Sequence, residues 1–126
     1  MSDNKPKKIL IAEDENAYAR ALVLKLQHAG FEAESVTNGE EALEAIKTGG
    51  FDLLLSDLVM PKMNGFQLLE EIKKQGLNIP AIGLSNLSQA DDEEKMRQAG
   101  AVDFMSKSNT PIIDVITKVE NFFNKK

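Results

Sequence analysis

Cysteine is absent from the 126-residue chain, and histidine occurs only once. The lack of cysteine excludes disulfides, thiolate metal ligands and cysteine nucleophiles. Also absent is any apolar stretch long enough to cross a bilayer, and the polar segment 1–8 lacks the hydrophobic core of a signal peptide. We therefore expect a cytoplasmic protein with no membrane partner.

What the chain does contain fits one folded domain. Hydrophobic residues make up 42% of the chain and charged residues 28%, the balance of a globular protein with a proper core. We expect a single domain over residues 1–126, of which residues 1–7 form a flexible N-terminus. The formal net charge of -5 and the pI near 4.9 argue against direct binding to nucleic acid or to an anionic membrane.

Short apolar runs alternate with helical patterns along the whole chain. The runs are bounded by polar or turn residues, which is typical of strands in a parallel sheet covered on both faces. The strands are expected at Ile9–Ala12, Leu53–Leu55, Ala81–Leu84 and Val102–Met105, with a weaker edge strand at Glu34–Val36. Apolar residues recur at helical spacing within Tyr18–Ala29, Asn38–Ile46, Gly65–Ile72 and Thr110–Phe123, whereas the pattern in Ser88–Ala99 is poor. We expect Asn38 to cap the second helix with Glu41 reaching back, and Thr110 to cap the fifth with Pro111 at its first position.

This alternation predicts the α/β fold class, with a five-stranded parallel sheet, five helices on its two faces and right-handed crossovers. In a flavodoxin-like, doubly wound sheet of strand order 2-1-3-4-5, ligands bind beyond the carboxyl ends of the strands. Polar residues follow four of the expected strands at those ends, namely Glu13, Asp14, Asp57, Ser85 and Lys107. In that order the first and third strands are neighbours, so Asp14 and Asp57 would lie side by side.

The residue types at this edge suit phosphoryl transfer. Neighbouring carboxylates cannot all stay ionised without compensation, and oxygen ligands without histidine or cysteine suit magnesium or manganese. With a metal bound, Asp57 can act as a nucleophile toward phosphorus and form an aspartyl phosphate. Lys107 could then pair with one phosphoryl oxygen, and the Ser85 hydroxyl could donate to another.

The order of these residues resembles the receiver domain of two-component response regulators, in the stand-alone form of the chemotaxis regulators. The match covers residues 7–125 and includes an acid pair, a phosphoacceptor aspartate, a Met-Pro-x-Met-Asn-Gly loop, a hydroxyl residue, an aromatic residue and a lysine. In this chain these are Glu13-Asp14, Asp57, Met60–Gly65, Ser85, Phe104 and Lys107. The resemblance implies a phosphorelay switch rather than an enzyme. The donor would be a histidine kinase or a phosphotransfer protein, and the downstream target is an unknown protein.

The same resemblance implies a role for each site residue. Magnesium would bind Asp14, Asp57 and the backbone carbonyl of Val59, while Glu13 would act through water. Ser85 and Phe104 would carry the switch between the two signalling states.

Two positions are expected to control the lifetime of the phosphorylated state. Val59 and Leu87 are the residues best placed, relative to Asp57 and Ser85, to orient an attacking water. Both are apolar and cannot hydrogen-bond that water, so we expect slow dephosphorylation.

One position departs from the family, because Ser108 follows Lys107 where proline is usual. A cis bond without proline costs about 3 kcal/mol, which favours a trans bond here.

Two other interpretations compete with a stand-alone switch. Haloacid-dehalogenase-like phosphatases also use a magnesium-bound aspartate at a strand end, but they require a second aspartate two residues on, where this chain has Val59. Alternatively, the chain is the receiver fragment of a longer regulator with a DNA-binding or enzymatic output domain.

Overall fold

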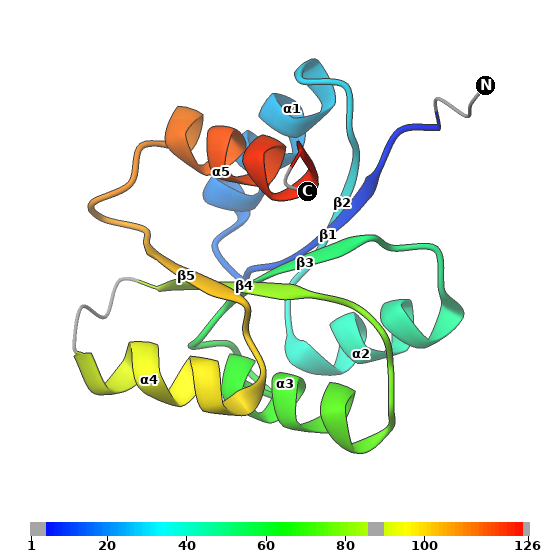
Figure 1. Cartoon of the computed structure of the whole chain (residues 1–126), viewed down its shortest axis with the longest axis vertical. Helices are drawn as coiled ribbons and strands as arrows, with labels where there is room; N and C mark the ends of the chain where they lie inside the picture. The colour runs from blue at the N-terminus through cyan, green and yellow to red at the C-terminus, as the bar shows by residue number, and fades with distance from the viewer. Residues whose placement is uncertain (1–4, 86–89, 125–126) are drawn as a thin grey trace.

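The computed structural model describes residues 5–85 and 90–124, apart from the side chains of residues 90–92. Strands and helices alternate strictly along the chain (Figure 1). The strands are β1 (Lys8–Ala12), β2 (Glu32–Val36), β3 (Leu53–Asp57), β4 (Ala81–Ser85) and β5 (Asp103–Ser106). The helices are α1 (Asn16–His28), α2 (Gly39–Thr48), α3 (Gly65–Lys74), α4 (Ala90–Ala99) and α5 (Ile112–Asn124).

The five strands form one parallel sheet in the order β2-β1-β3-β4-β5. This confirms the predicted fold class and strand order, including the edge position of β2. Helices α1 and α5 cover one face of the sheet, and α2, α3 and α4 cover the other (Figure 1). None of the helices among the described residues is long and apolar enough to span a bilayer.

Pairing with β4 makes β3 longer than its apolar run. We predicted a strand ending at Leu55, but Ser56 and Asp57 continue it, opposite Gly83 and Leu84. All five residues of β3 are buried. Asp57 is therefore the last residue of a central strand and not part of the loop that follows.

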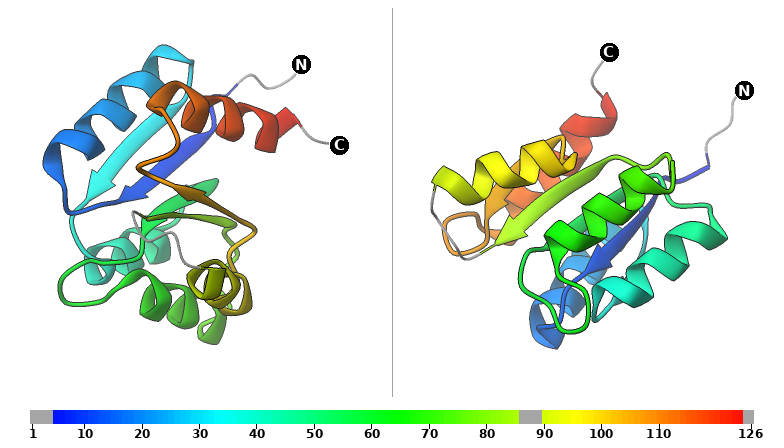
Figure 2. Two further views of the ribbon diagram at one scale, coloured as in Figure 1. Left: turned by 90° about the vertical axis from the view of Figure 1, so that its left-hand side faces the viewer. Right: turned by 90° about the horizontal axis from the view of Figure 1, so that it is seen from below.

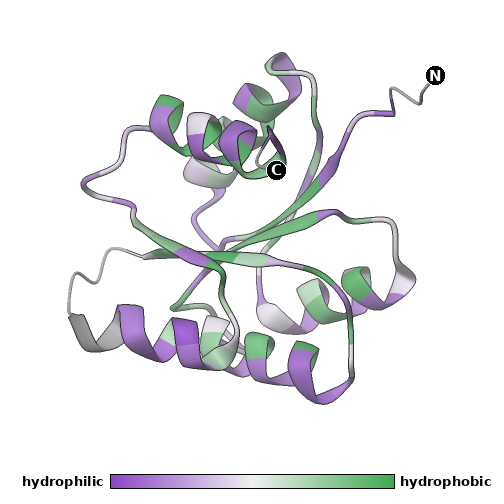
Figure 3. Cartoon of the chain, viewed as in Figure 1, coloured by the Kyte–Doolittle hydropathy of each residue, from purple (hydrophilic) through white to green (hydrophobic). Residues whose placement is uncertain are grey.

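Alternate residues of the strands feed two apolar cores, one on each face of the sheet. Leu10, Leu54 and Ala81 point to the side of α2, α3 and α4, whereas Ile9, Leu55 and Ile82 point to the side of α1 and α5. Hydrophobic colour runs along the strands and the inward sides of the helices in Figure 3. Helix α4 is mostly hydrophilic. Among its described side chains, only that of Met96 is fully buried.

The helix starts differ in detail from the predicted ones. The Asn38 side chain caps α2 as expected, accepting a 2.8 Å hydrogen bond from the Glu41 N–H, but Glu41 reaches back to the N–H of Thr37. Pro111 precedes α5 instead of forming its first turn, and its carbonyl accepts from the Asp114 N–H at 2.8 Å. We did not predict the reciprocal capping box of Asn64 and Gln67 at the start of α3.

Two close approaches fix the loop between β3 and α3. The Gly65 N–H donates to the Leu58 carbonyl at 2.9 Å, and a Cβ at Gly65 would collide with the Asp57 carbonyl oxygen. Gly39 in α2 donates its N–H to the Met63 carbonyl at 3.0 Å. The segment directly after Asp57 is thus held at both of its ends by glycines that admit no side chain.

Candidate functional site

All five strands point toward the same end of the sheet, where the loops after β1, β3 and β5 come together (Figure 2). Glu13, Asp14 and Asp57 meet there, each offering one carboxylate oxygen within 4.8 Å of the others. Lys107, from the loop after β5, reaches the same group of acids. The structure therefore brings these four residues together at one edge of the sheet, as predicted.

Asp57 is held in a buried position, with only 5% of its surface exposed. Its Oδ1 accepts a 2.8 Å hydrogen bond from the Leu58 N–H, and its Oδ2 lies 3.5 Å from the Lys107 Nζ. Burial raises the pKa of Asp57 above its ordinary value, against the opposing effects of Lys107 and the neighbouring backbone N–H groups. Keeping Asp57 ionised therefore depends on nearby positive charge.

Glu13 is more deeply buried than Asp57, at 1% exposure. Its Oε1 accepts from Lys107 at 2.9 Å, and its Oε2 accepts from the Glu15 N–H at 3.0 Å. Burial raises the pKa of Glu13, although the hydrogen bond from Lys107 counteracts part of that effect. Because both oxygens are already engaged, Glu13 is less open to direct metal ligation than Asp14, whose carboxylate is exposed.

Lys107 is the positive centre of the site. Its ammonium contacts Glu13 at 2.9 Å, Glu15 at 3.0 Å and Asp57 at 3.5 Å, and it lies 4.8 Å from the centre of the Tyr18 ring. Burial alone would lower the pKa of Lys107, but the hydrogen bonds to Glu13 and Glu15 and the charge of Asp57 raise it above its ordinary value. Lys107 therefore remains charged at neutral pH.

The loop that carries Lys107 is tied to the end of β4. The Lys107 N–H donates to the Ser85 carbonyl at 2.8 Å. The bond from Lys107 to Ser108 is trans, as we expected from the missing proline, and no described peptide bond is cis. A trans bond at this point is thus compatible with placing the ammonium against the acids.

The proposed switch residues lie on neighbouring strands. Ser85 is buried at the end of β4. Phe104 is half-buried, pairs in register with Gly83 and packs against the core that contains Met96. A Cβ at Gly83 would collide with the end of Met96 and lie 3.0 Å from the Phe104 ring, so Gly83 makes room for both side chains.

The structure describes one of the two residues expected to control the lifetime of the phosphorylated state. Val59 is 62% exposed, on the loop after Asp57. Leu87 lies outside the described residues. Their joint role stays a prediction.

The donor atoms fit a hard divalent cation. Every candidate ligand is an oxygen, and the repulsion among three carboxylates within 4.8 Å, which Lys107 offsets in part, would be reduced further by a bound cation. Magnesium accepts a few carboxylates and keeps several waters, which suits a set with one exposed member. Among the described residues, Glu13, Asp14 and Asp57 are the carboxylates that could hold such an ion.

Two residues of this site were not predicted as such. Glu15 was not considered, and Tyr18 was counted only as an apolar member of the α1 stripe, yet both contact Lys107. The buried hydroxyl of Tyr18 has no hydrogen-bond partner in the described part of the chain. A third acid directly after the acid pair was the available signal for Glu15.

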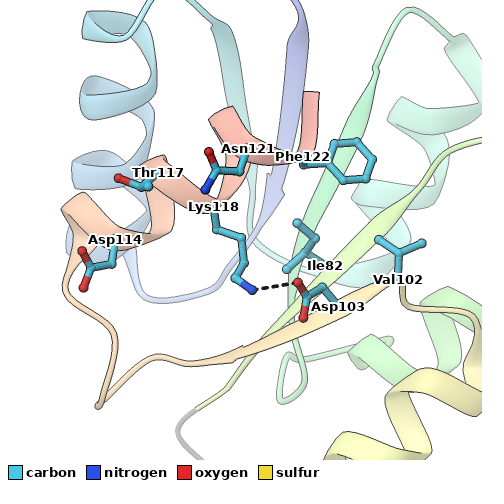
Figure 4. A pocket seen from close by; sticks show the side chains of 8 residues that line it. All are labelled: Ile82, Val102, Asp103, Asp114, Thr117, Lys118, Asn121 and Phe122. Carbon is cyan, nitrogen blue, oxygen red and sulfur yellow. Dashed lines mark hydrogen bonds and ion pairs between the residues drawn. The ribbon is translucent and has the colours of Figure 1, made fainter. Parts of the chain in front are cut away.

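A separate groove lies away from the acidic cluster, between β5 and α5 (Figure 4). It has a volume of about 670 Å³ and is lined by Ile82, Val102, Asp103, Asp114, Thr117, Lys118, Asn121 and Phe122. A 2.8 Å ion pair between Lys118 and Asp103 crosses it. Asp103 directly precedes Phe104, so the groove and the proposed switch share one strand.

Comparison with known proteins defines the class of this domain. The response regulator receiver domain family matches residues 9–119, so the chain belongs to that family. Phosphorylation and magnesium binding at an acidic pocket are general features of the family, whose members act with histidine kinases and output domains as signalling domains.

Among curated proteins, the chain is similar to the sensor histidine kinase RcsC of Escherichia coli, at 29% identity over the whole chain but only 13% of the kinase. The transcriptional regulatory protein DltR of Streptococcus agalactiae is 34% identical over 79% of this chain and 45% of its own length. The chain thus spans less than half the length of these relatives.

Solved structures of receiver domains alone match almost end to end. The receiver domain of the Francisella response regulator 1452 superposes with a TM-score of 0.88 at 28% identity, covering 94% of this chain and 98% of that one. A CheY-like receiver domain protein from Methanospirillum hungatei gives a TM-score of 0.87 at 26% identity, covering 96% of both chains.

Proposed function

We propose that Asp57 is the phosphoacceptor of this receiver domain and that phosphorylation depends on magnesium. The observation that carries the proposal is the position of Asp57, buried at the end of β3 with Lys107 at 3.5 Å and the acid pair within 4.8 Å. Glu13 also lies beside Lys107, but both of its oxygens already accept hydrogen bonds, from Lys107 and from the Glu15 N–H.

The transfer itself is a displacement at phosphorus. An oxygen of Asp57 forms a bond to phosphorus while the bond from phosphorus to the donor nitrogen of a phosphohistidine breaks. The donor imidazole keeps the electron pair, and no proton leaves Asp57 because it reacts as the carboxylate. Lys107 and the Ser85 hydroxyl bind the phosphoryl oxygens. Asp14, Asp57 and the Val59 carbonyl would hold the magnesium ion, which would neutralise the remaining charge on those oxygens.

The signal passes from Ser85 to Phe104. We propose that the Ser85 hydroxyl moves toward the phosphoryl group and that the Phe104 ring turns further inward, toward Met96. The partner-binding change would then fall on the β5–α5 groove of Figure 4, because Asp103 at its edge is the neighbour of Phe104. A downstream protein is the expected target, and direct nucleic-acid contact is not part of the proposal for this domain.

Membership of the family supports the donor and the setting that we propose. A histidine kinase or a phosphotransfer protein supplies the phosphoryl group, in the cytoplasm. We propose that residues 1–126 act as one receiver unit whose only chemistry is its own phosphorylation and dephosphorylation. The relatives named above are longer proteins, and one is a transcriptional regulator by name. An attached output domain is therefore the second candidate arrangement, and phosphotransfer to Asp57 is common to both.

Intact mass measurement tests the phosphoacceptor. Wild type treated with acetyl phosphate and magnesium should gain one phosphate, and Asp57→Asn should gain none. Asp52→Asn is the matched control, because Asp52 lies just before the other end of the same strand, where its carboxylate accepts from the Lys8 N–H. Equal uptake by Asp57→Asn and wild type would reject the assignment.

A further inference from the structure

The ammonium of Lys107 is held away from the proposed phosphoacceptor in the resting protein. Its two hydrogen bonds go to Glu13 at 2.9 Å and to Glu15 at 3.0 Å, whereas Asp57 lies at 3.5 Å, beyond a normal N–H···O hydrogen bond. The Tyr18 ring bounds the ammonium on a further side, at 4.8 Å from its centre. Three of these four described neighbours therefore come from one part of the chain, with Glu13 and Glu15 in the turn between β1 and α1 and Tyr18 in α1.

Among the described residues, the Glu15 side chain forms a hydrogen bond only with Lys107. Glu15 occupies the N-cap position of α1, but its side chain makes no capping hydrogen bond there. Its side chain is 64% exposed, whereas the Lys107 side chain that it contacts is only 7% exposed. An exposed carboxylate thus covers a buried lysine beside the reactive aspartate.

A lysine ammonium has three N–H donors, and Glu13 and Glu15 accept from two of them. Because Asp57 lies at 3.5 Å, closer contact with a phosphoryl group on Asp57 would draw the ammonium away from one of these two partners. Giving up Glu13 would leave a fully buried carboxylate without its positive partner, which is costly. Giving up Glu15 returns an exposed carboxylate to water, where ion pairs contribute little. Glu15 is therefore the partner that Lys107 can exchange at the lowest cost.

We propose that Glu15 is a positioning residue that holds Lys107 in the resting protein and yields it to the phosphoryl group, so that Glu15 limits how readily Asp57 is phosphorylated. This inference rests on the proposed function of Asp57. Glu13 and the Tyr18 ring keep the ammonium within reach of Asp57 during the exchange.

Two substitutions distinguish the effect of the contact between Glu15 and Lys107 from the effect of the negative charge of Glu15. Glu15→Gln removes the charge, and Glu15→Asp keeps the charge but shortens the side chain by one methylene, so that it no longer reaches Lys107 at 3.0 Å. Both variants should be phosphorylated by acetyl phosphate about 1.5- to fivefold faster than wild type, the range expected for one exposed ion pair. Glu70→Gln, which removes an exposed charge on α3, should match wild type and controls for net charge.

A rate for Glu15→Asp equal to that of wild type, with Glu15→Gln faster, would trace the effect to charge alone and overturn the proposal. Equal rates for all variants would overturn it as well. The resting contact is measured independently of phosphorylation, from the side-chain NMR resonances of Lys107 in magnesium-free protein. These should shift in Glu15→Asp and stay in place in Glu70→Gln. Unchanged Lys107 resonances in Glu15→Asp would overturn this inference on their own, whereas a wild type that takes up no phosphate would overturn the proposed function.

Discussion

The first residue of α2, Gly39, hydrogen-bonds through its N–H to the Met63 carbonyl at 3.0 Å. A Cβ at Gly39 would collide with that carbonyl oxygen and lie 2.8 Å from the Met63 side chain. Met63 belongs to the loop that also contains Val59, so α2 helps to fix the loop that carries one of the expected magnesium ligands.

Gly39→Ala should therefore displace the loop and weaken the metal site. We expect a loss of about 1–3 kcal/mol in the free energy of unfolding, typical of an added methyl group without space, together with weaker magnesium binding. Denaturant unfolding and magnesium titration measure the two effects. Glu40→Ala, at the next and exposed position, is the control. A Gly39→Ala protein with unchanged stability would show that the loop can move freely.

Magnesium affinity should depend on Asp14 more than on Glu13. Asp14 is exposed, whereas both oxygens of Glu13 are already engaged by Lys107 and the Glu15 N–H. Asp14→Ala should nearly abolish magnesium binding, and Glu13→Ala should weaken it by about tenfold, as is usual for groups that act through another ligand. Calorimetric titration at fixed pH gives both values. Unchanged affinity in Asp14→Ala would rule out the site.

The acidic cluster should make stability depend on pH in a definite direction. Burial raises the pKa values of Asp57 and Glu13 in the folded protein, so folding disfavours their ionised forms. A raised carboxyl pKa contributes stability at low pH, and that contribution is lost as the pH rises through the folded-state value.

In magnesium-free buffer at pH 7, Asp57→Asn should therefore melt a few degrees higher than wild type, and the difference should shrink as the pH falls toward 4. Glu44→Gln, on the exposed side of α2, should show no such trend. An Asp57→Asn protein that melts lower than wild type at pH 7 would contradict the cost assigned to this buried charge.

Activation should reach α4 and β5. Helix α4 has Met96 as the fully buried anchor among its described side chains, and Met96 shares the space above Gly83 with Phe104. Movement of the Phe104 ring should loosen or shift that anchor. Amide exchange with and without beryllofluoride and magnesium should reveal changed protection in α4 and β5. Changes confined to Asp57 and the loop after it would contradict this route, and Phe104→Ala should reduce the changes in α4.

The phosphorylated state should be long-lived for the family. Val59 is exposed beside Asp57 and cannot orient an attacking water, and we assign the same property to Leu87 from its place in the sequence. The double variant Val59→Asn with Leu87→Glu should lose its phosphate faster than wild type in magnesium buffer. A control with Leu24→Asn, exposed on α1, should decay as wild type does. Equal decay of the double variant and wild type would remove these two positions from control of the lifetime.

Much of the fold could be predicted because apolar periodicity reports which residues are buried. It places the middle of each strand well and its ends poorly. Pairing with β4 adds Ser56 and Asp57 to β3, and β5 begins at Asp103, opposite Ile82, one residue after the predicted start at Val102. Strand ends depend on backbone partners in neighbouring strands, which a single segment of sequence does not contain.

The acids and the lysine of the site could be predicted for a related reason. Parallel strands in a known order send their carboxyl ends to one edge, so order alone brings Glu13, Asp57 and Lys107 together. The direction of the Lys107 side chain could not be predicted, because it follows from the geometry of its loop. For that reason Glu15 and Tyr18 were missed.

The two edges of the sheet bear on how this protein behaves at high concentration. The β2 edge carries the exposed glutamates Glu32 and Glu34, and the opposite edge, β5, is only four residues long. A strand from a second molecule pairing with β2 would meet two carboxylates, and one pairing with β5 would find few backbone partners. Charged and short edges of this kind oppose open-ended strand addition. They protect a sheet whose central strand, if it were exposed during folding, would be prone to aggregate.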